Sequence, residues 1–307
     1  MNPRMIRGIT INISGKDTLM KKITSMNRRT LLKTGLGAAA ATAVTTETFA
    51  AYKAPHEVRV VFLGGDFYHN PITQEQTWRR VFGVTDWRLM YVQDSSFVTP
   101  EILSNTDLFV MTRYMTDTQT TNFSLGFSPD QIVEDRAVPS YFMTDELENA
   151  IISNVERGMG MLSLHCSIWN GNKPRFMDML DVAQPHMHTK VQPALIHKLN
   201  GNHPISRGIE DFSVGDDEIF FADLKSPADH TVLFNIKGEE QVTDRAGGWC
   251  RDVGKGRVVS MLPGHTPGPY VNQSYRKLLW RSAHWAMKKD IPPSTHIKQS
   301  FDTSNYG

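Results

Sequence analysis

Short apolar runs recur along the chain after residue 56, and each is bounded by glycine or polar residues. A continuous apolar run of this length is typical of a strand that is buried on both faces. We therefore predict strands at Val58–Leu63, Trp87–Val92, Asp107–Met111, Met161–Leu164, Thr231–Ile236 and Arg257–Leu262.

Segments with helical periodicity lie between these runs. The clearest one begins at Thr144, a residue type that caps helices, places Leu147, Ile151 and Val155 on one face and ends at Gly158. Two further helices are predicted at Gln74–Phe82 and Gln273–Met287. Alternating strands and helices form a parallel sheet that helices cover on both faces, so the pattern predicts an α/β protein.

Two stretches interrupt this alternation. Gly254-Lys255-Gly256 predicts the turn of a hairpin, because glycine tolerates a positive φ. Residues 114–141 are polar and show no period, which fits either a surface insertion or a lid over a site. The chain has no internal repeat or interior linker, and we predict one domain at residues 57–288 with a C-terminal tail at residues 289–307.

The first fifty residues differ from the rest. Arg28 and Arg29 precede a weakly apolar run at residues 35–44, and residues 48–50 offer a cleavage site of small residues. This order is typical of a twin-arginine export signal, so we expect a periplasmic protein. An ordinary N-terminal helix and a membrane anchor are the alternatives. Because export signals begin close to the start codon, we interpret residues 1–50 as an extension and signal peptide whose true start is Met26.

Composition narrows the class of partner. Of the 307 residues, 40% are hydrophobic and 21% are charged, which is typical of a soluble globular protein. Residues 1–50 hold eight of the 33 basic and two of the 32 acidic residues, so the remainder has 25 basic and 30 acidic residues, a net charge of −5. A mildly acidic chain without a basic tract is a poor nucleic-acid binder. The run at residues 35–44 is shorter than the roughly 20 apolar residues of a bilayer span, so no stable membrane insertion is expected either.

Three histidines follow predicted strands. His69 comes after the first strand, His165 after the fourth and His265 after the last. In open α/β sheets, side chains beyond the carboxyl ends of the strands converge on one site, and imidazole transfers protons or binds metal ions there. We expect an active site, while a hydrogen-bonded core histidine is the plain alternative for His165. His69 lies farther beyond its strand, where a position at the rim fits as well as that of a ligand.

Other polar residues could join such a site. His186 and His188 are two apart, and on an extended chain they face the same way and could share a metal ion. Asp217 and Glu218 precede an apolar stretch and fit an acid/base carboxylate, a metal ligand or a solvated turn. His203 lies in a turn-like segment, where it fits a substrate contact or a capping residue.

The sequence contains two cysteines, Cys166 and Cys250. An oxidising periplasm would permit a disulfide between them, although their spacing cannot establish its geometry. The segment from Gly158 to Ser167 resembles the place where class I glutamine amidotransferase-like folds hold a nucleophile. Cys166 lacks the G-x-C-x-G turn that would expose its sulfur, so a small buried apolar side chain is its expected role and His165 is the expected working residue.

Several ordered motifs together resemble the trehalose-utilisation (ThuA-like) family, from about Val58 to Ala286. They are G-x-G-x-x-x-x-H at Gly158–His165, H-P-I-x-x-G-I at His203–Ile209, the pair Asp217-Glu218, and G-K-G-R-V ending in L-P-G-H at Gly254–His265. The resemblance implies a flavodoxin-like, three-layer α/β/α sandwich of the class I glutamine amidotransferase type with a mostly parallel sheet. It also implies a link to the catabolism of disaccharides and their 3-keto derivatives.

The same resemblance assigns roles to individual residues. By position, His165, Glu218 and His265 match the polar motifs of the family's crevice and are expected to be catalytic, and His188 matches the histidine that precedes the H-P segment. One divalent metal ion, zinc or a similar ion, is expected at His165, His188 and His265. Contacts with the substrate are expected from His69, Trp169, Asp217 and His203.

We therefore predict an exported hydrolase, lyase or isomerase that acts on a disaccharide or 3-keto-glycoside by metal-assisted or His/Glu acid–base chemistry. Its partner is a small-molecule sugar or keto-sugar, and a homo-oligomer is compatible with the sequence. The first alternative is a non-catalytic sugar-binding or sensing module in which Trp169, Trp249 and Tyr270 stack on sugar rings. The second is a hydrolase that depends on Cys166.

Overall fold

Every apolar run that predicts a strand forms one in the computed structural model of the chain. The structure describes residues 57–66, 68–82, 85–115, 141–186, 188–239 and 245–291. The predicted signal peptide, residues 116–140 of the predicted insertion and residues 292–307 of the predicted tail lie outside this part of the chain. The described residues all belong to the unit Lys53–Gly307.

A nine-stranded sheet runs through the described part, with the strand order β2-β1-β3-β4-β11-β10-β9-β6-β7. Five neighbouring strands are parallel, as predicted: β2 (Arg88–Val92), β1 (Arg59–Gly64), β3 (Leu108–Thr112), β4 (Gly160–Leu164) and β11 (Gly256–Met261). Because these five strands point the same way, their carboxyl ends meet along one edge of the sheet.

Antiparallel strands extend the sheet beyond β11. They are β10 (Arg245–Val253), β9 (Thr231–Gly238), β6 (Gln192–His197) and β7 (Phe212–Asp217). A separate antiparallel pair is formed by β5 (Val182–His186) and β8 (Phe221–Leu224). The hairpin β10–β11 was predicted, whereas β5, β6, β7 and β8 were not.

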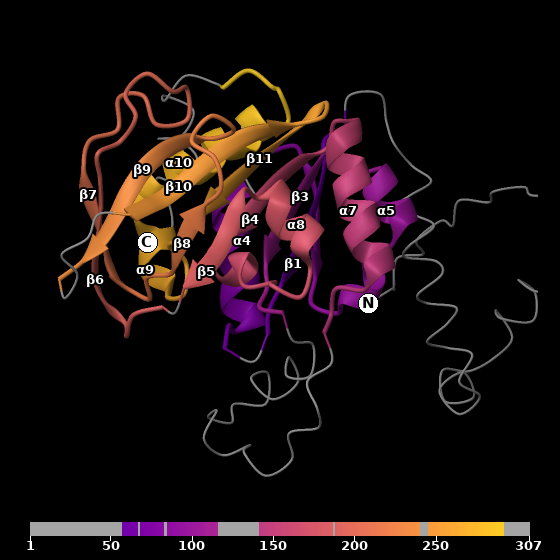
Figure 1. The fold of residues 1–307 in the computed structure, drawn as a ribbon, viewed down its shortest axis with the longest axis horizontal. Coiled ribbons are helices and arrows are strands. Elements are labelled where there is room, and N and C mark those ends of the chain that lie inside the picture. Colours follow the sequence, from indigo (N-terminus) through magenta and orange to yellow (C-terminus); the bar gives the residue numbers. More distant parts are fainter. Residues whose placement is uncertain are drawn as a thin grey trace, which may run out of the picture. The chain divides into compact units, whose positions relative to one another are not determined.

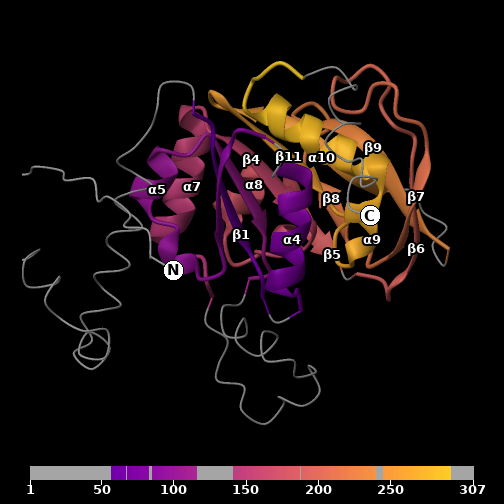
Figure 2. The same ribbon diagram turned by 180° about the vertical axis from the view of Figure 1, so that it is seen from behind.

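Helices cover both faces of the sheet. The segments α7 (Asp145–Arg157) and α8 (Pro174–Met179) lie on the face toward the viewer in Figure 1. The opposite face, seen in Figure 2, carries α4 (Pro71–Phe82), α9 (Pro267–Val271) and α10 (Gln273–Ala286). The short α5 (Pro100–Ser104) and the 3-10 turns η1 (Ser95–Phe97) and η3 (His165–Ile168) complete the described elements. The chain is therefore a mixed α/β protein, and among the described residues no helix is long and apolar enough to span a membrane.

Local chemistry sets the ends of these elements. The Thr144 hydroxyl accepts a hydrogen bond from the backbone N–H of Leu147 and caps α7, as predicted, and Gly158 ends this helix with a φ of 134°. Gly254 forms the turn between β10 and β11 with a φ of 57°. A Cβ on Gly256 would lie 2.1 Å from the carbonyl oxygen of Val155, so only glycine lets β11 approach α7 this closely. These contacts fix β11, which leads into the His265 loop.

Aromatic side chains fill the core between β1 and α4. The Trp78 ring lies 5.1 Å from the Phe62 ring and stacks on Phe82 with an angle of 9° between the ring planes. All three side chains are buried. This packing fixes α4 and, with it, the loop that joins β1 to α4 and carries His69.

Candidate metal centre

His165 occupies a strained position directly after β4. Its backbone has a φ of 47°, in the left-handed region that residues other than glycine rarely adopt, and its side chain is fully buried. Ring nitrogen Nδ1 lies 2.9 Å from the carbonyl oxygen of Leu262, at the end of β11. An Nδ1–H that donates to this carbonyl leaves Nε2 as the available donor atom for a metal or a substrate.

His69 is held inside the protein by Asp66. The loop after β1 folds back on itself, with backbone hydrogen bonds in both directions between Asp66 and His69. His69 Nδ1 also lies 2.6 Å from Asp66 Oδ1, and the Asp66 carboxylate accepts the backbone N–H groups of Tyr68 and Tyr114. Burial lowers the pKa of His69, but the charge and hydrogen bond of Asp66 together with the charges of Glu218 and Asp217 outweigh it, and the pKa lies above its ordinary value. His69 is 4% exposed, so the interpretation as a rim residue is wrong.

His265 lies in the loop after β11, which Asp217 positions. The two carboxylate oxygens of Asp217 accept the backbone N–H groups of Gly264 at 2.7 Å and Thr266 at 2.9 Å. Gly264 has a φ of 144°, and a Cβ there would lie 2.4 Å from the Tyr270 hydroxyl oxygen. Burial and the neighbouring His165 imidazole lower the pKa of His265 to about 4.

Glu218 connects the histidines. It lies between β7 and β8 and points Oε2 at the cluster, 3.3 Å from His265 Nδ1 and 3.5 Å from His165 Nε2. Its other oxygen, Oε1, lies 2.7 Å from His188 Nδ1. Burial raises the pKa of Glu218, but hydrogen bonding and charge from His165, His265 and His188 outweigh it, and the pKa lies below its ordinary value.

These four side chains offer ligand atoms that all lie within 4.8 Å of one another: His69, His165, Glu218 and His265. The buried nitrogens His69 Nε2, His165 Nε2 and His265 Nδ1 have no hydrogen-bond partner within the described residues. A buried polar atom without a partner is costly, and several that converge beside a carboxylate fit a bound cation. Imidazole and carboxylate are ligands of zinc and similar ions. The residues present therefore fit a divalent metal ion.

The outer contacts of the histidines fit this interpretation. Histidines that bind a metal ion generally donate their second ring nitrogen to a carboxylate or a backbone carbonyl, which fixes the ring and raises its basicity. The Asp66 carboxylate contacts Nδ1 of His69, and the backbone carbonyl of Leu262 contacts Nδ1 of His165. Asp66 was not identified in the sequence, although it lies three residues before a predicted site histidine.

The other predicted site residues differ in whether they contact the cluster. His188 contacts Glu218 but does not belong to the group of four, and its side chain is 39% exposed. Trp169 lies beside the cluster, with its ring 6.2 Å from Phe220, whose own ring lies 4.7 Å from His165. Asp217 is fully buried and its carboxylate accepts backbone N–H groups, so this geometry gives no support to its predicted contact with substrate.

His203 lies apart from the cluster. Its Nε2 is 3.6 Å from Cys250 Sγ on β10, and its ring packs on Trp285 of α10. The predicted contact of His203 with a substrate at the strand ends therefore has no support in this geometry. Among the aromatic residues proposed to stack on sugars, Trp249 and Tyr270 are buried at 1% and 4% exposure, which leaves Trp169.

The two cysteines are free and buried, so the disulfide between them is not formed. Cys166 Sγ lies 3.6 Å from His69 Nδ1 and 3.8 Å from Asp66 Oδ2. Burial and the Asp66 carboxylate raise the pKa of the Cys166 thiol well above its ordinary value. A thiol that is difficult to ionise and shielded from solvent is a poor nucleophile, which argues against the Cys166-dependent hydrolase.

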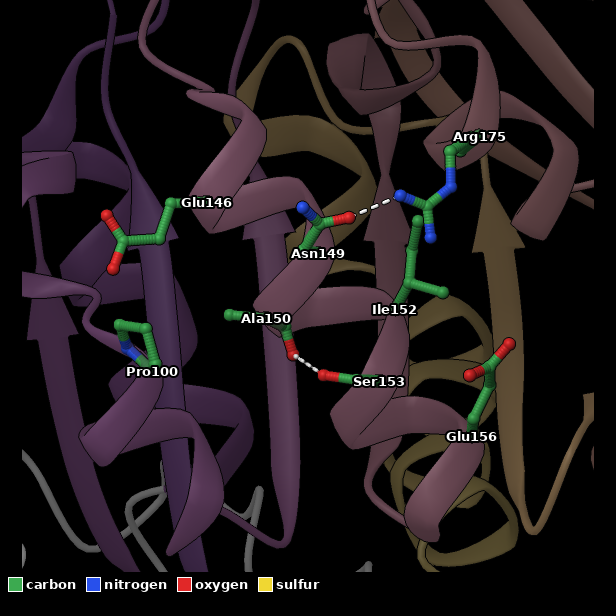
Figure 3. A pocket seen from close by; sticks show the side chains of 8 residues that line it. All are labelled: Pro100, Glu146, Asn149, Ala150, Ile152, Ser153, Glu156 and Arg175. Carbon is green, nitrogen blue, oxygen red and sulfur yellow. Dashed lines mark hydrogen bonds between the residues drawn. The ribbon is translucent and has the colours of Figure 1, made fainter.

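A separate pocket of about 600 Å³ lies on the outer side of α7, between α5 and α8. Figure 3 shows the Arg175 guanidinium donating to the Asn149 side chain at its upper end and Glu156 at its lower end. None of its lining residues belongs to the histidine cluster. The pocket is therefore not the place where that cluster would meet a ligand.

The fold and the cluster define an α/β protein with a candidate metal centre beyond the carboxyl ends of parallel strands. The sequence profile of the ThuA family, described as trehalose utilisation, matches residues 57–286, and the chain belongs to this family.

Solved structures show a similar fold. One is a ThuA-like protein from Bacteroides uniformis ATCC 8492, with a TM-score of 0.58 at 16% identity, covering 78% of this chain and 94% of that one. Another is a ThuA-like protein from Parabacteroides merdae ATCC 43184, with a TM-score of 0.56 at 13% identity, covering 77% and 92%. At these identities the likeness concerns the fold. A search of curated proteins found no match.

Proposed function

We propose that this protein is a metal-dependent enzyme that acts on a disaccharide or a 3-keto-glycoside. The observation that carries the proposal is the convergence on Glu218 of three buried imidazole nitrogens that form no hydrogen bond within the described residues. Membership of a trehalose utilisation family supports a sugar as substrate. Helices on both faces of the sheet support the three-layer sandwich as the architecture that carries this site.

In this proposal, the side chains have separate roles. His69, His165 and His265 would hold the ion, because three protein ligands with one open position are typical of catalytic zinc sites. When bound, the ion supplies Lewis-acid stabilisation of negative charge on a substrate oxygen. Glu218 takes the proton next to the carbonyl of a keto-sugar, because its Oε2 borders the imidazoles and its side chain is 12% exposed. His188 orients Glu218 through Oε1.

Metal analysis tests this division. Purified wild-type protein is expected to hold one divalent ion per chain, measured by elemental analysis after dialysis. His69→Ala and His165→Ala are expected to lose it, whereas Glu218→Gln is expected to keep it and lose turnover of keto-glycosides. His203→Ala and His186→Ala are matched controls outside the cluster and should keep the ion. Wild-type protein without a stoichiometric ion would overturn the proposal.

A non-catalytic sugar-binding module is the alternative. It has less support, because two of the three aromatic residues that it requires are buried. Turnover separates the two functions: sugar binding by the wild-type protein without product formation, and equal binding by Glu218→Gln, would favour the binding module.

We also propose export through the twin-arginine route to the periplasm, on the support of Arg28 and Arg29 and the apolar run that follows them. The double variant Arg28→Lys/Arg29→Lys should retain the protein in the cytoplasmic fraction of the host. Lys33→Arg keeps the charge of the same segment and should leave export unchanged. Equal periplasmic amounts of both variants would contradict the proposed route.

A further inference from the structure

Aromatic side chains continue the site along one edge of the sheet. Tyr68 follows β1, Tyr114 follows β3 and Trp169 follows β4, and these three strands are neighbours in the sheet. Each side chain therefore lies beyond the same carboxyl edge as His69 and His165. Sequence analysis identified Trp169 alone, because the two tyrosines are near each other only through the sheet order.

Neighbouring aromatic side chains along this edge of the sheet lie close together. The rings of Tyr68 and Tyr114 meet edge to face, with centres 5.7 Å apart. The Trp169 side chain neighbours the Tyr114 hydroxyl and favours its ionised form, although burial keeps the pKa of Tyr114 above its ordinary value. The Trp169 ring lies 6.2 Å from Phe220, which contacts the His165 ring at 4.7 Å. We call Phe220, Trp169, Tyr114 and Tyr68 the aromatic row.

Exposure increases along the aromatic row. Phe220 is 4% exposed beside the histidines, Trp169 and Tyr114 are partly exposed, and Tyr68 at the far end is 44% exposed. Single exposed aromatic residues are common, but a contacting row that leads from solvent to a buried polar cluster offers a continuous surface to a ligand. The row has the form of a binding surface with its reactive end at the histidines.

The chemistry of the row matches a carbohydrate. One face of a pyranose ring presents C–H groups that pack on an aromatic ring, and its edge presents hydroxyls. Tyrosine and tryptophan provide an apolar face and a polar group together. A sugar ring is about the size of one aromatic ring, so the row extends beyond the length of a single sugar.

We infer that the aromatic row binds the second sugar ring of a substrate with at least two rings, while the first ring reaches the histidine cluster. This inference rests on the proposed function, because it takes the cluster as the reactive end. In this arrangement, Tyr68 and Tyr114 recognise the second sugar ring.

Calorimetric titration of the metal-loaded protein tests the inference. The probes are trehalose, maltose and lactose, with glucose and galactose as their one-ring counterparts. We expect at least one disaccharide to bind about tenfold more tightly than its monosaccharides, a ratio that one well-formed aromatic contact can supply. Tyr68→Ala and Tyr114→Ala should remove most of this preference.

Conservative variants separate stacking from structural damage. Tyr68→Phe keeps the ring and should keep the preference for the disaccharide, whereas Tyr68→Ala should lose it. The metal content of all these variants should equal that of the wild-type protein. A preference that survives both alanine variants, or no disaccharide that binds more tightly than its monosaccharides, would overturn the inference. Absence of the ion from wild-type protein would instead overturn the proposed function.

Discussion

His165 combines a left-handed backbone with a fully buried imidazole, and this combination has a cost. A residue other than glycine in this region costs roughly 1–3 kcal/mol and persists where the surroundings determine it. Leu262 and Glu218 both contact its ring. The strain places the imidazole at the turn after β4, with Nε2 facing the Glu218 carboxylate.

Asp66 gives a prediction at the residue scale. Asp66→Asn removes the charge that faces His69 Nδ1 and should weaken metal binding about 10–100-fold, the usual effect of losing such a partner. A competition titration against a chelator measures this change. Asp223→Asn is the matched control, because Asp223 also pairs with a histidine, His186, at 2.7 Å, but its side chain is exposed. Equal affinities in both variants would show that Asp66 has no role in the site.

Sequence patterns could identify His165, Glu218 and His265 because each lies at a predicted strand end or in a longer motif. The burial of His69 could not be predicted, since it depends on the backbone turn between Asp66 and His69 that draws the loop inward. The loop contacts of Asp217 could not be predicted for a related reason. In the sequence, the carboxylate beside Glu218 has no evident partner. Only the folded loop shows that it accepts the backbone N–H of Gly264.

Among the elements, those with strong local signals were predictable. The parallel strands are continuous apolar runs, and α7 carries both a Thr144 cap and a terminal glycine. Polar residues, glycine and prolines interrupt the strands β5 to β8, so no period of two marks them. Their pairing is set by long-range contacts with β9 and with one another.

The α7 cap gives a prediction at the element scale. Thr144→Ala removes the acceptor for the Leu147 N–H and should lower the free energy of unfolding by about 1 kcal/mol. Urea denaturation measures this loss. Thr144→Ser keeps the hydroxyl and should unfold close to wild type. Because α7 carries none of the four residues of the cluster, neither variant should change the metal content, and loss of metal in Thr144→Ala would contradict the proposed site.

At the scale of the molecule, the cluster joins segments from both parts of the sheet. His69, His165 and His265 follow parallel strands, whereas Glu218 comes from the link between β7 and β8. An ion at this point would therefore tie the parallel strands to the segment that follows the outer antiparallel strand. We expect the ion to contribute to the stability of the whole domain as well as to its chemistry.

Thermal unfolding tests this coupling. A ligand that binds only the folded state at 100 times its dissociation constant adds about 2.7 kcal/mol, so added zinc should raise the Tm of stripped wild-type protein by several degrees. His165→Ala should show no such rise, while the control His203→Ala should show the full one. A rise of equal size in both variants would place the stabilising ion elsewhere.

The position of His265 also sets the order in which the site can assemble. This histidine follows β11, near the end of the described chain, and β11 pairs with β4 only after the intervening strands have been made. A chain still under synthesis thus holds an incomplete set of ligands. The ion proposed above would therefore be selected only after His265 has been made, and on the proposed export route for folded proteins the cytoplasmic metal pool would supply it.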